Sequence, residues 1–249
     1  YSAQTIFAEK VNKNLKNVIN NNNINKLILP YEGQPFQNFI LSKLDNKIKT
    51  YGIIHSILPA LPTNLIKRKG SPKKIYVSGQ QQKHILVNHL GWNKRKVNVI
   101  KSLRFNNKIN KDISGSIFLP INLKNIEKII INFKNLLNSN IKPQMPTLKV
   151  RNHPAMLKSI SHNYLSHKLE KLIKIDKKKN QKYKKNLCIF IGPTSSVIEL
   201  LVKKFNIVHI PINPILDIYS NKLFLDIVSI KKHNFYIYKK LKRKNIILL

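Results

Sequence analysis

Short apolar runs alternate along the chain with longer amphipathic stretches. Apolar runs bounded by Gly, Pro, Asn or Ser predict strands, and apolar residues spaced three and four apart predict helices. Strands that alternate with helices of about 10–15 residues are typical of βαβ units and a parallel sheet. The pattern predicts strands at residues 27–30, 50–55, 74–79, 97–100, 116–121, 147–150, 187–191 and 207–210, and helices at 34–44, 80–90, 123–137, 155–173 and 197–205.

A polar stretch at residues 106–114 separates two such series. We therefore expect an α/β fold of two Rossmann-like domains that face each other, the first at residues 1–108 and the second at 109–249. The first series is short, and the chain begins at Tyr1 rather than at a methionine. We expect the N-terminal domain to be incomplete for this reason, with part of it upstream of the sequence.

Basic charge dominates the composition, with 46 Lys+Arg against 10 Asp+Glu and a formal net charge of +36. Such an excess is typical of nucleic-acid-binding proteins. However, 41 of the basic residues are lysines and five are arginines, and about one residue in eight is asparagine. Lys, Asn and Ile share A/T-rich codons, whereas a nucleic-acid surface favours Arg, whose planar guanidinium binds phosphate and guanine bidentately. The charge therefore indicates codon bias more than a nucleic-acid partner.

The rest of the composition narrows the class of protein. The chain is 42% hydrophobic, which is enough to build a core. Its single cysteine, Cys188, excludes a disulfide framework and fits a reducing compartment. No apolar run approaches the ~18–20 residues of a membrane-spanning helix. We expect a cytoplasmic protein whose lysine-rich surface favours peripheral contact with anionic lipid at the inner face of the cell membrane, at roughly 1 kcal/mol per suitably placed lysine.

One turn is the best candidate for a phosphate site. Ligands of open parallel sheets bind beyond the carboxyl ends of the strands, and Gly192–Ser196 lies between an expected strand and an expected helix. The free N–H groups of such a turn and the hydroxyls of Thr194, Ser195 and Ser196 favour binding of an anion. The alternative interpretation is ordinary capping of the helix by a hydroxyl.

Scarce charged residues lie near other expected strand and helix ends. A protonated His153 could stabilise or protonate a departing phosphate, and Arg151 could offset the phosphate charge; a purely structural histidine is the alternative. Arg104 is a further candidate for lining a cleft. Glu199, one helical turn after Ser195, is a candidate acceptor for ribose hydroxyls, or alternatively an ion-pair partner of Lys203.

Two residues at strand ends of the first series complete the candidates. Glu32 follows the first expected strand and is a candidate general base towards an acceptor hydroxyl, although a solvated turn residue is the alternative. His55, at the end of the second expected strand, is a candidate for lining the same cleft. No two acidic residues stand in Asp-x-Asp spacing, the metal-binding signature of another class of sugar transferases. Neither a metal site nor a resident cofactor is therefore predicted.

The order of these pieces resembles the two-domain GT-B glycosyltransferases of bacterial surface-polysaccharide synthesis. Bacterial sialyltransferases and polysialyltransferases of this type carry an acidic pair followed by Gly, a His-Pro motif and a Ser/Thr-Ser motif. The surface carbohydrate biosynthesis family also carries a Gly-Trp … Ser-Leu-Arg-Tyr stretch. The matching residues, within a likeness that covers residues 27–215, are Glu32-Gly33, His153-Pro154, Ser195-Ser196, Gly91-Trp92 and Ser102-Leu103-Arg104-Phe105.

The resemblance implies a metal-independent, inverting glycosyltransferase that transfers a sugar, such as a nonulosonic acid from a CMP donor, to a surface glycan. It implies that Glu32 is the general base, that His153 assists departure of the nucleotide phosphate, and that Ser195 and Ser196 bind that phosphate. Tyr31 departs from the family pattern, because it stands where the first acidic residue is expected. Two alternatives remain open: a non-catalytic GT-B-like protein, and a basic nucleic-acid-binding protein such as an organellar ribosomal protein.

Overall fold

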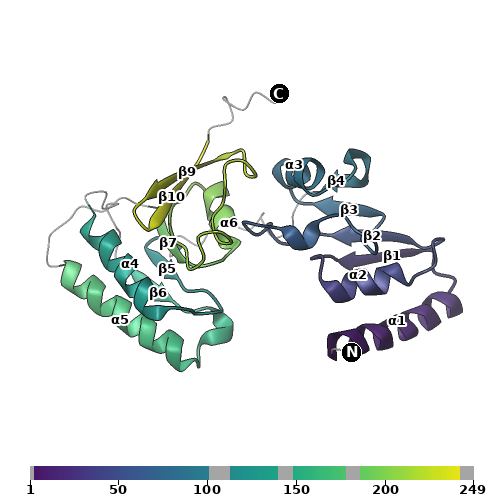
Figure 1. Ribbon diagram of the computed structural model, residues 1–249, viewed down its shortest axis with the longest axis horizontal. Coiled ribbons are helices and arrows are strands. Elements are labelled where there is room, and N and C mark those ends of the chain that lie inside the picture. Colours follow the sequence, from purple (N-terminus) through teal and green to yellow (C-terminus); the bar gives the residue numbers. More distant parts are fainter. Residues whose placement is uncertain (1–2, 101–112, 140–147, 178–185, 242–249) are drawn as a thin grey trace. The chain divides into compact units, whose positions relative to one another are not determined.

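The computed structural model describes residues 3–100, 113–139, 148–177 and 186–241 (Figure 1). The chain divides into two compact units, one made of residues 1–58 and 62–106 and the other of residues 59–61 and 107–249. Arg104 lies outside the described residues. Each unit is α/β with parallel strands, as expected, and compatible with a Rossmann-like fold. No helix in the described ranges is long and apolar enough to cross a bilayer.

The first unit contains a four-stranded, wholly parallel sheet whose spatial order, β1-β2-β3-β4, follows the chain. Glycine, proline and asparagine residues punctuate its elements, since they favour turns. The elements are α1 (Ala3–Asn21), β1 (Lys26–Pro30), α2 (Pro35–Ser42), β2 (Lys49–Ile53), the 3-10 helix η1 (Thr63–Leu65), β3 (Lys74–Val77), α3 (Gln80–His89), η2 (Lys94–Lys96) and β4 (Val97–Val99).

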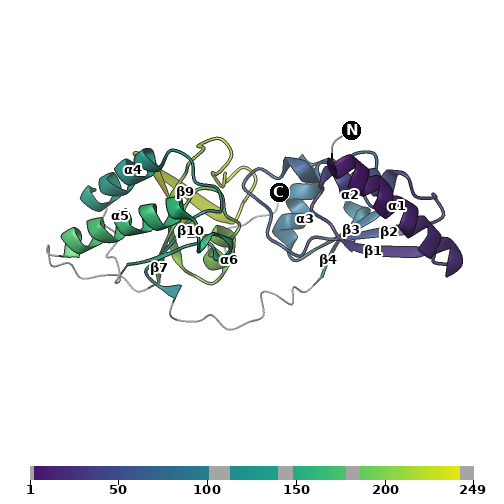
Figure 2. The same cartoon turned by 90° about the horizontal axis from the view of Figure 1, so that it is seen from below.

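The two faces of this first sheet differ. α1, α2 and α3 lie on one side of the sheet (Figure 2). Side chains alternate between the faces of a strand, and in β3 one of the two sets, Ile75 and Val77, is buried. On the opposite face Ile28 is 63% exposed, and the neighbouring rings of Tyr51 and Tyr76 are half-buried. No described helix of this unit covers that face, although parallel sheets normally bury both.

The second unit contains a six-stranded sheet of order β6-β5-β7-β8-β10-β9. The first four strands in this order are parallel, and the hairpin β9–β10 adds antiparallel to β8. The elements are β5 (Ser116–Phe118), α4 (Ile126–Asn138), β6 (Lys149–Arg151), η5 (Pro154–Met156), α5 (Ile160–Lys177), β7 (Leu187–Ile191), α6 (Ser196–Val202), β8 (Asn206–Ile210), β9 (Ile227–Lys232) and β10 (Phe235–Lys240).

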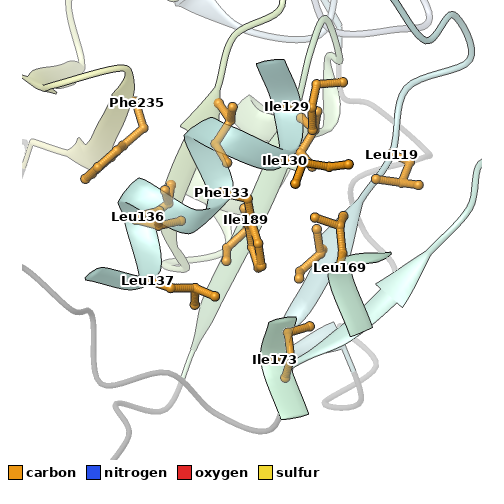
Figure 3. Close-up of a cluster of buried hydrophobic side chains, with 14 of the residues drawn as sticks. Leu119, Ile129, Ile130, Phe133, Leu136, Leu137, Leu169, Ile173, Ile189 and Phe235 are labelled. Atoms are coloured by element: carbon orange, nitrogen blue, oxygen red, sulfur yellow. The ribbon is translucent and has the colours of Figure 1, made fainter. Parts of the chain in front are cut away.

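The core of the second unit lies between this sheet and the helices α4 and α5 (Figures 1 and 3). Phe133 of α4 and Leu169 of α5 are fully buried against Ile189 of β7. α6 lies on the opposite face of the sheet (Figure 1). The chain therefore leaves β5 towards one face and its neighbour β7 towards the other, and the strand order reverses between them. In open α/β sheets that reversal creates the crevice in which ligands bind.

Three parts of the sequence prediction need correction. The helix expected at 155–173 begins at Ile160, because Pro154 opens the separate turn η5, in which the N–H of Met156 bonds to the carbonyl of His153. α1 and the hairpin β9–β10 were not expected at all. In α1, lysine and asparagine interrupt the apolar pattern that identifies a helix from sequence. In β9 and β10 the apolar run is only about four residues long and ends in two lysines.

Candidate functional site

The turn after β7 lies where the strand order reverses. β7 is buried along its whole length, and Gly192 follows it with a φ of +68°, in the left-handed region that favours glycine. A Cβ at this position would lie 2.7 Å from Cδ1 of Ile212 and 3.2 Å from Cγ of Pro120. Glycine therefore lets the backbone turn between the segments that follow β5 and β8.

The hydroxyls of this turn divide into two kinds. Oγ1 of Thr194 accepts a hydrogen bond of 3.3 Å from the N–H of Ser196. Ser195 stands at the N-cap of α6 without a side-chain capping bond. Among the described residues, no hydrogen bond involves the hydroxyl of Ser195 or Ser196, and both residues are half-buried. Capping thus accounts for Thr194, whereas the two serine hydroxyls are open to a ligand.

Two buried side chains hold the turn from inside the unit. Nε2 of His209, on β8, lies 2.9 Å from the carbonyl oxygen of Gly192. The hydroxyl of Tyr219 donates a 2.9 Å hydrogen bond to the carbonyl of Thr194. Burial lowers the pKa of His209 to about 4, although its bond to Gly192 and the nearby Asp217 carboxylate oppose this shift. Sequence reasoning missed both residues; a histidine within the apolar run 207–210 was the one available signal.

His153 lies at the same edge of the sheet as the turn. It follows β6, and the order β6-β5-β7 places one strand between them, so the two strand ends are about 10 Å apart. Its Nδ1 accepts a 3.2 Å hydrogen bond from the N–H of Ala155, which caps η5. Within the described ranges, its Nε2 has no hydrogen-bond partner. The structural role expected for this histidine is therefore present, and one ring nitrogen remains for a ligand.

Arg151 makes a different contact. Its Nε donates a 2.7 Å hydrogen bond to Oγ of Ser116. Because Ser116 begins β5 and Arg151 ends the parallel strand β6, this contact draws Nε back along the sheet, away from the turn. Glu199 is half-buried in the first turn of α6, next to Ser195 and Ser196 in the helix. Binding of a nucleotide by Arg151 or Glu199 stays a prediction.

A second buried histidine fixes the end of β5 beside the turn. Nε2 of His162, at the start of α5, lies 2.8 Å from the carbonyl oxygen of Pro120, and its Nδ1 lies 2.9 Å from Oγ of Ser159. A carbonyl can only accept, so Nε2 of His162 is the donor. The segment that follows β5, whose Pro120 lies beside Gly192, is therefore also held by a hydrogen bond. Sequence reasoning missed His162.

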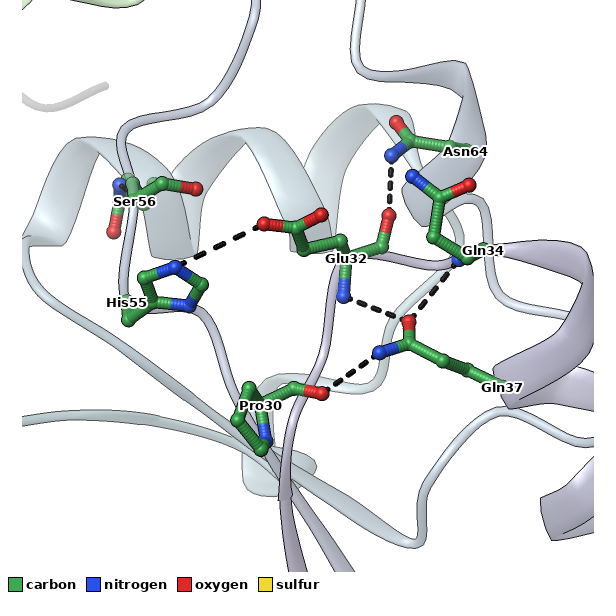
Figure 4. Close-up of polar contacts among 8 residues, drawn as sticks. Pro30, Glu32, Gln34, Gln37, His55, Ser56 and Asn64 are labelled. Carbon is green, nitrogen blue, oxygen red and sulfur yellow. Dashed lines mark hydrogen bonds and ion pairs between the residues drawn. The ribbon is translucent and has the colours of Figure 1, made fainter. Parts of the chain in front are cut away.

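In the first unit the structure brings Glu32 and His55 together. Their side chains follow the neighbouring parallel strands β1 and β2, and Oε1 of Glu32 lies 3.8 Å from Nε2 of His55 (Figure 4). The two side chains are 46% and 53% exposed, respectively. The pair is an ion pair when the imidazole is protonated. The sequence left open whether Glu32 is a general base or merely a solvated turn residue. In the structure its carboxylate is partly exposed to solvent and also lies beside His55.

The backbone that carries Glu32 is held in place. Oε1 of Gln37 accepts from the N–H of Glu32 at 3.0 Å, and its Nε2 donates to the carbonyl of Pro30 at 2.8 Å (Figure 4). Nδ2 of Asn64 donates to the carbonyl of Glu32. The next residue, Gly33, has a φ of +70°, and a Cβ there would lie 2.0 Å from the carbonyl oxygen of Asn64. Glycine is therefore required after Glu32.

The structure gives a physical reason for the tyrosine that precedes Glu32. Tyr31 is fully buried, and its hydroxyl donates a 2.8 Å hydrogen bond to Oδ1 of Asn38. Its ring meets that of Trp92 edge to face, with the centroids 6.5 Å apart. Burial raises the pKa of the Tyr31 hydroxyl. An acidic residue in this place would bury a charge, so position 31 belongs to the core of the first unit.

The two edges differ in chemistry. The turn of the second unit offers two hydroxyls, and the pair Glu32–His55 offers a carboxylate and an imidazole that can accept protons. Within the part of the chain that the structure describes, no three His, Cys, Asp or Glu side chains are grouped so as to hold a metal ion. No protein-family model, curated protein or solved structure matches the chain. A function for this chain is therefore inferred from the site residues alone.

Proposed function

We propose that the chain is a metal-independent, inverting glycosyltransferase of the GT-B type. It transfers a sugar from a nucleotide donor to a glycan acceptor in surface-polysaccharide synthesis. The observation that carries the proposal is the turn Gly192–Ser196 at the reversal of strand order, where the hydroxyls of Ser195 and Ser196 have no hydrogen-bond partner in the described part of the chain. Ligands of α/β sheets bind at such a reversal, and paired hydroxyls are suited to phosphate oxygens.

The donor is assigned to the second unit. Ser195 and Ser196 donate to oxygens of the phosphate, and Glu199 accepts from the ribose hydroxyls. His153 donates from Nε2 to the departing phosphate, with Arg151 adding positive charge. The resemblance to sialyltransferases supports a nonulosonic acid carried by CMP as the donor. The enzyme works in the cytoplasm, where its lysine-rich surface contacts anionic lipid.

The first unit supplies the base. In the proposed step an acceptor hydroxyl oxygen forms a bond to the anomeric carbon, and its proton passes to the carboxylate of Glu32. The bond from the anomeric carbon to the phosphate oxygen breaks, and its electron pair leaves with the nucleotide. His55 stabilises the glutamate carboxylate when the imidazole is protonated. Because the attack comes from the side opposite the phosphate, the configuration at the anomeric carbon inverts.

Titration of the purified protein with CMP and with UDP tests this function. Wild type should bind one of the two saturably. The double variant Ser195→Ala/Ser196→Ala should bind that nucleotide at least about tenfold more weakly, because hydrogen bonds to a charged group contribute roughly 1.5–3 kcal/mol each. Ser229→Ala, a half-buried serine on β9, is the matched control and should bind as wild type does.

Two results would contradict the proposal. One is equal affinity of the double variant and wild type for the nucleotide. The other is tight RNA binding with a steep dependence on salt and no saturable nucleotide binding, which would favour the nucleic-acid alternative.

A further inference from the structure

Three carbonyl groups of the turn Gly192–Ser196 are bonded to groups of the second unit itself. A carbonyl oxygen that faced a phosphate would repel it, so a phosphate-binding turn needs its carbonyls tied elsewhere. The carbonyl of Gly192 is bonded to His209, that of Thr194 to Tyr219, and that of Ser195 accepts the N–H of Ile198. The N–H of Gly192 is bonded to the carbonyl of Ile210 and that of Ser196 to Oγ1 of Thr194. The N–H groups of Thr194 and Ser195 and the two serine hydroxyls have no partner among the described residues and remain for a ligand.

The bond to Gly192 belongs to a chain of hydrogen bonds with one direction. Nε2 of His209 is the donor, because the carbonyl of Gly192 can only accept. In the neutral ring Nδ1 is then an acceptor, and it lies 3.2 Å from the hydroxyl of Tyr238, on β10. The oxygen of Tyr238 in turn accepts a 3.2 Å hydrogen bond from the backbone N–H of Tyr219. His209, Tyr238 and Tyr219 thus connect β8, β10 and the segment that follows β8.

Tyr219 closes this chain back onto the turn. Its N–H starts the chain, and its own hydroxyl donates to the carbonyl of Thr194 at 2.9 Å. Tyr219 therefore holds Thr194 directly, and through Tyr238 and His209 it also holds Gly192, two positions earlier in the turn. We call His209, Tyr219 and Tyr238 the brace of the turn. All three are buried, so water does not compete for these bonds.

The segment that carries Tyr219 is itself fixed. Oδ2 of Asp217 accepts hydrogen bonds of 2.9 Å from the N–H groups of both Ile212 and Asn213. Asp217 is buried, and its own N–H donates to the carbonyl of Asn213 at 3.0 Å. This local loop holds the chain after β8 in one conformation. The hydroxyl of Tyr219 therefore meets Thr194 without a further loss of backbone freedom.

We propose that His209, Tyr219 and Tyr238 are positioning residues of the nucleotide site, which fix the turn so that its donors converge on phosphate. This inference rests on the proposed function, because it requires that the turn bind the phosphate of a nucleotide. The proposed function names the groups that contact the phosphate. The inference adds that three residues without contact to the ligand hold those groups in the geometry that binds it. It also predicts that the brace acts on the phosphate and not on the nucleoside.

The experiment compares a nucleotide with its nucleoside. Tyr219→Phe removes the hydroxyl that holds Thr194 and leaves the ring and the N–H in place; Tyr238→Phe breaks the chain in its middle. Tyr236→Phe, also on β10, is the control, because in the described part of the chain its hydroxyl has no hydrogen-bond partner. Affinities of the full chain for CMP and cytidine, and for UDP and uridine, are measured by NMR titration at a temperature where every variant is folded.

We expect Tyr219→Phe and Tyr238→Phe to bind the preferred nucleotide about five- to tenfold more weakly, the size of one lost hydrogen bond, while binding of its nucleoside stays within about twofold of wild type. A merely structural role would weaken nucleotide and nucleoside alike, or neither, and either result overturns the inference. If wild type itself binds neither nucleotide, the proposed function fails and this inference with it. If wild type binds and both Phe variants bind equally well, the brace alone is refuted.

Discussion

The carboxyl ends of the parallel strands differ between the two sheets in where their polar side chains lie. In the first unit the strand order follows the chain, and Glu32 and His55 stand about half in solvent. In the second unit the order reverses, and the polar side chains behind the turn, such as His209 and Asp217, are buried. An exposed pair can move to meet a proton, whereas a buried network holds donors in a fixed geometry before the ligand arrives. The difference suits proton transfer at one edge and anion binding at the other.

The largest expected effect separates turnover from binding. Glu32→Gln should lower kcat by about 10²–10⁴-fold, because the acceptor proton loses its base, while the affinity for the donor nucleotide stays that of wild type. Glu9→Gln, an exposed residue of α1, controls for the loss of one carboxylate. Initial rates with labelled donor, together with nucleotide titration, measure the two quantities. Normal turnover in Glu32→Gln, or a parallel loss of donor affinity, would refute this division of roles.

The two glycines that follow β1 and β7 give the next comparison. Gly33 and Gly192 share a left-handed φ, which costs another residue about 1–2 kcal/mol. An added Cβ at Gly33 meets the backbone of Asn64, whereas one at Gly192 meets the movable end of the Ile212 side chain. We expect Gly33→Ala to destabilise the first unit by roughly 3–5 kcal/mol and Gly192→Ala the second by roughly 1–2 kcal/mol. Urea unfolding that resolves the two units checks the ranking, and equal losses would contradict it.

The third prediction concerns the stability of the second unit in acid, which depends on the buried His209. Its pKa is lowered to about 4 in the folded chain by burial, against about 6.5 when unfolded. Between these values the unfolded state binds more protons, so the second unit should lose roughly 3 kcal/mol of stability as the pH falls from about 6.5 to 4, and none of this above pH 6.5. Urea midpoints across this range measure the slope. His209→Gln should abolish it, and an unchanged slope in that variant would assign the effect to other groups.

The sequence predicts those features that depend on local pattern. The buried run of β7, the turn after it and the placement of Glu32 at a strand end all follow from apolar runs and their punctuation. The parallel sheets follow from alternation of strands and helices. The pairing of Glu32 with His55 also follows in outline, since carboxyl ends of neighbouring parallel strands share one edge.

Strand order and the brace could not be predicted in this way. Periodicity does not say that β6 takes the outer place, which sets the distance between His153 and the turn. The brace and its bond to Gly192 join residues up to 46 positions apart, from Gly192 to Tyr238, and only His209, within an apolar run, stands out in the sequence. Tyr238 stands in a lysine-flanked hairpin, and Tyr219 in a segment without regular structure. Such contacts arise from tertiary packing, for which a single sequence carries no local signal.

The open face of the first sheet has a consequence for handling the protein in solution. Ile28 and the rings of Tyr51 and Tyr76 form an apolar surface, and Lys26, Lys49 and Lys74 stand on the same face. Lysines around a flat apolar patch act as gatekeepers against face-to-face association of copies. Their repulsion is screened over about 10 Å at 0.1 M salt. Low ionic strength should therefore keep this protein dispersed, and concentrated salt should drive its self-association.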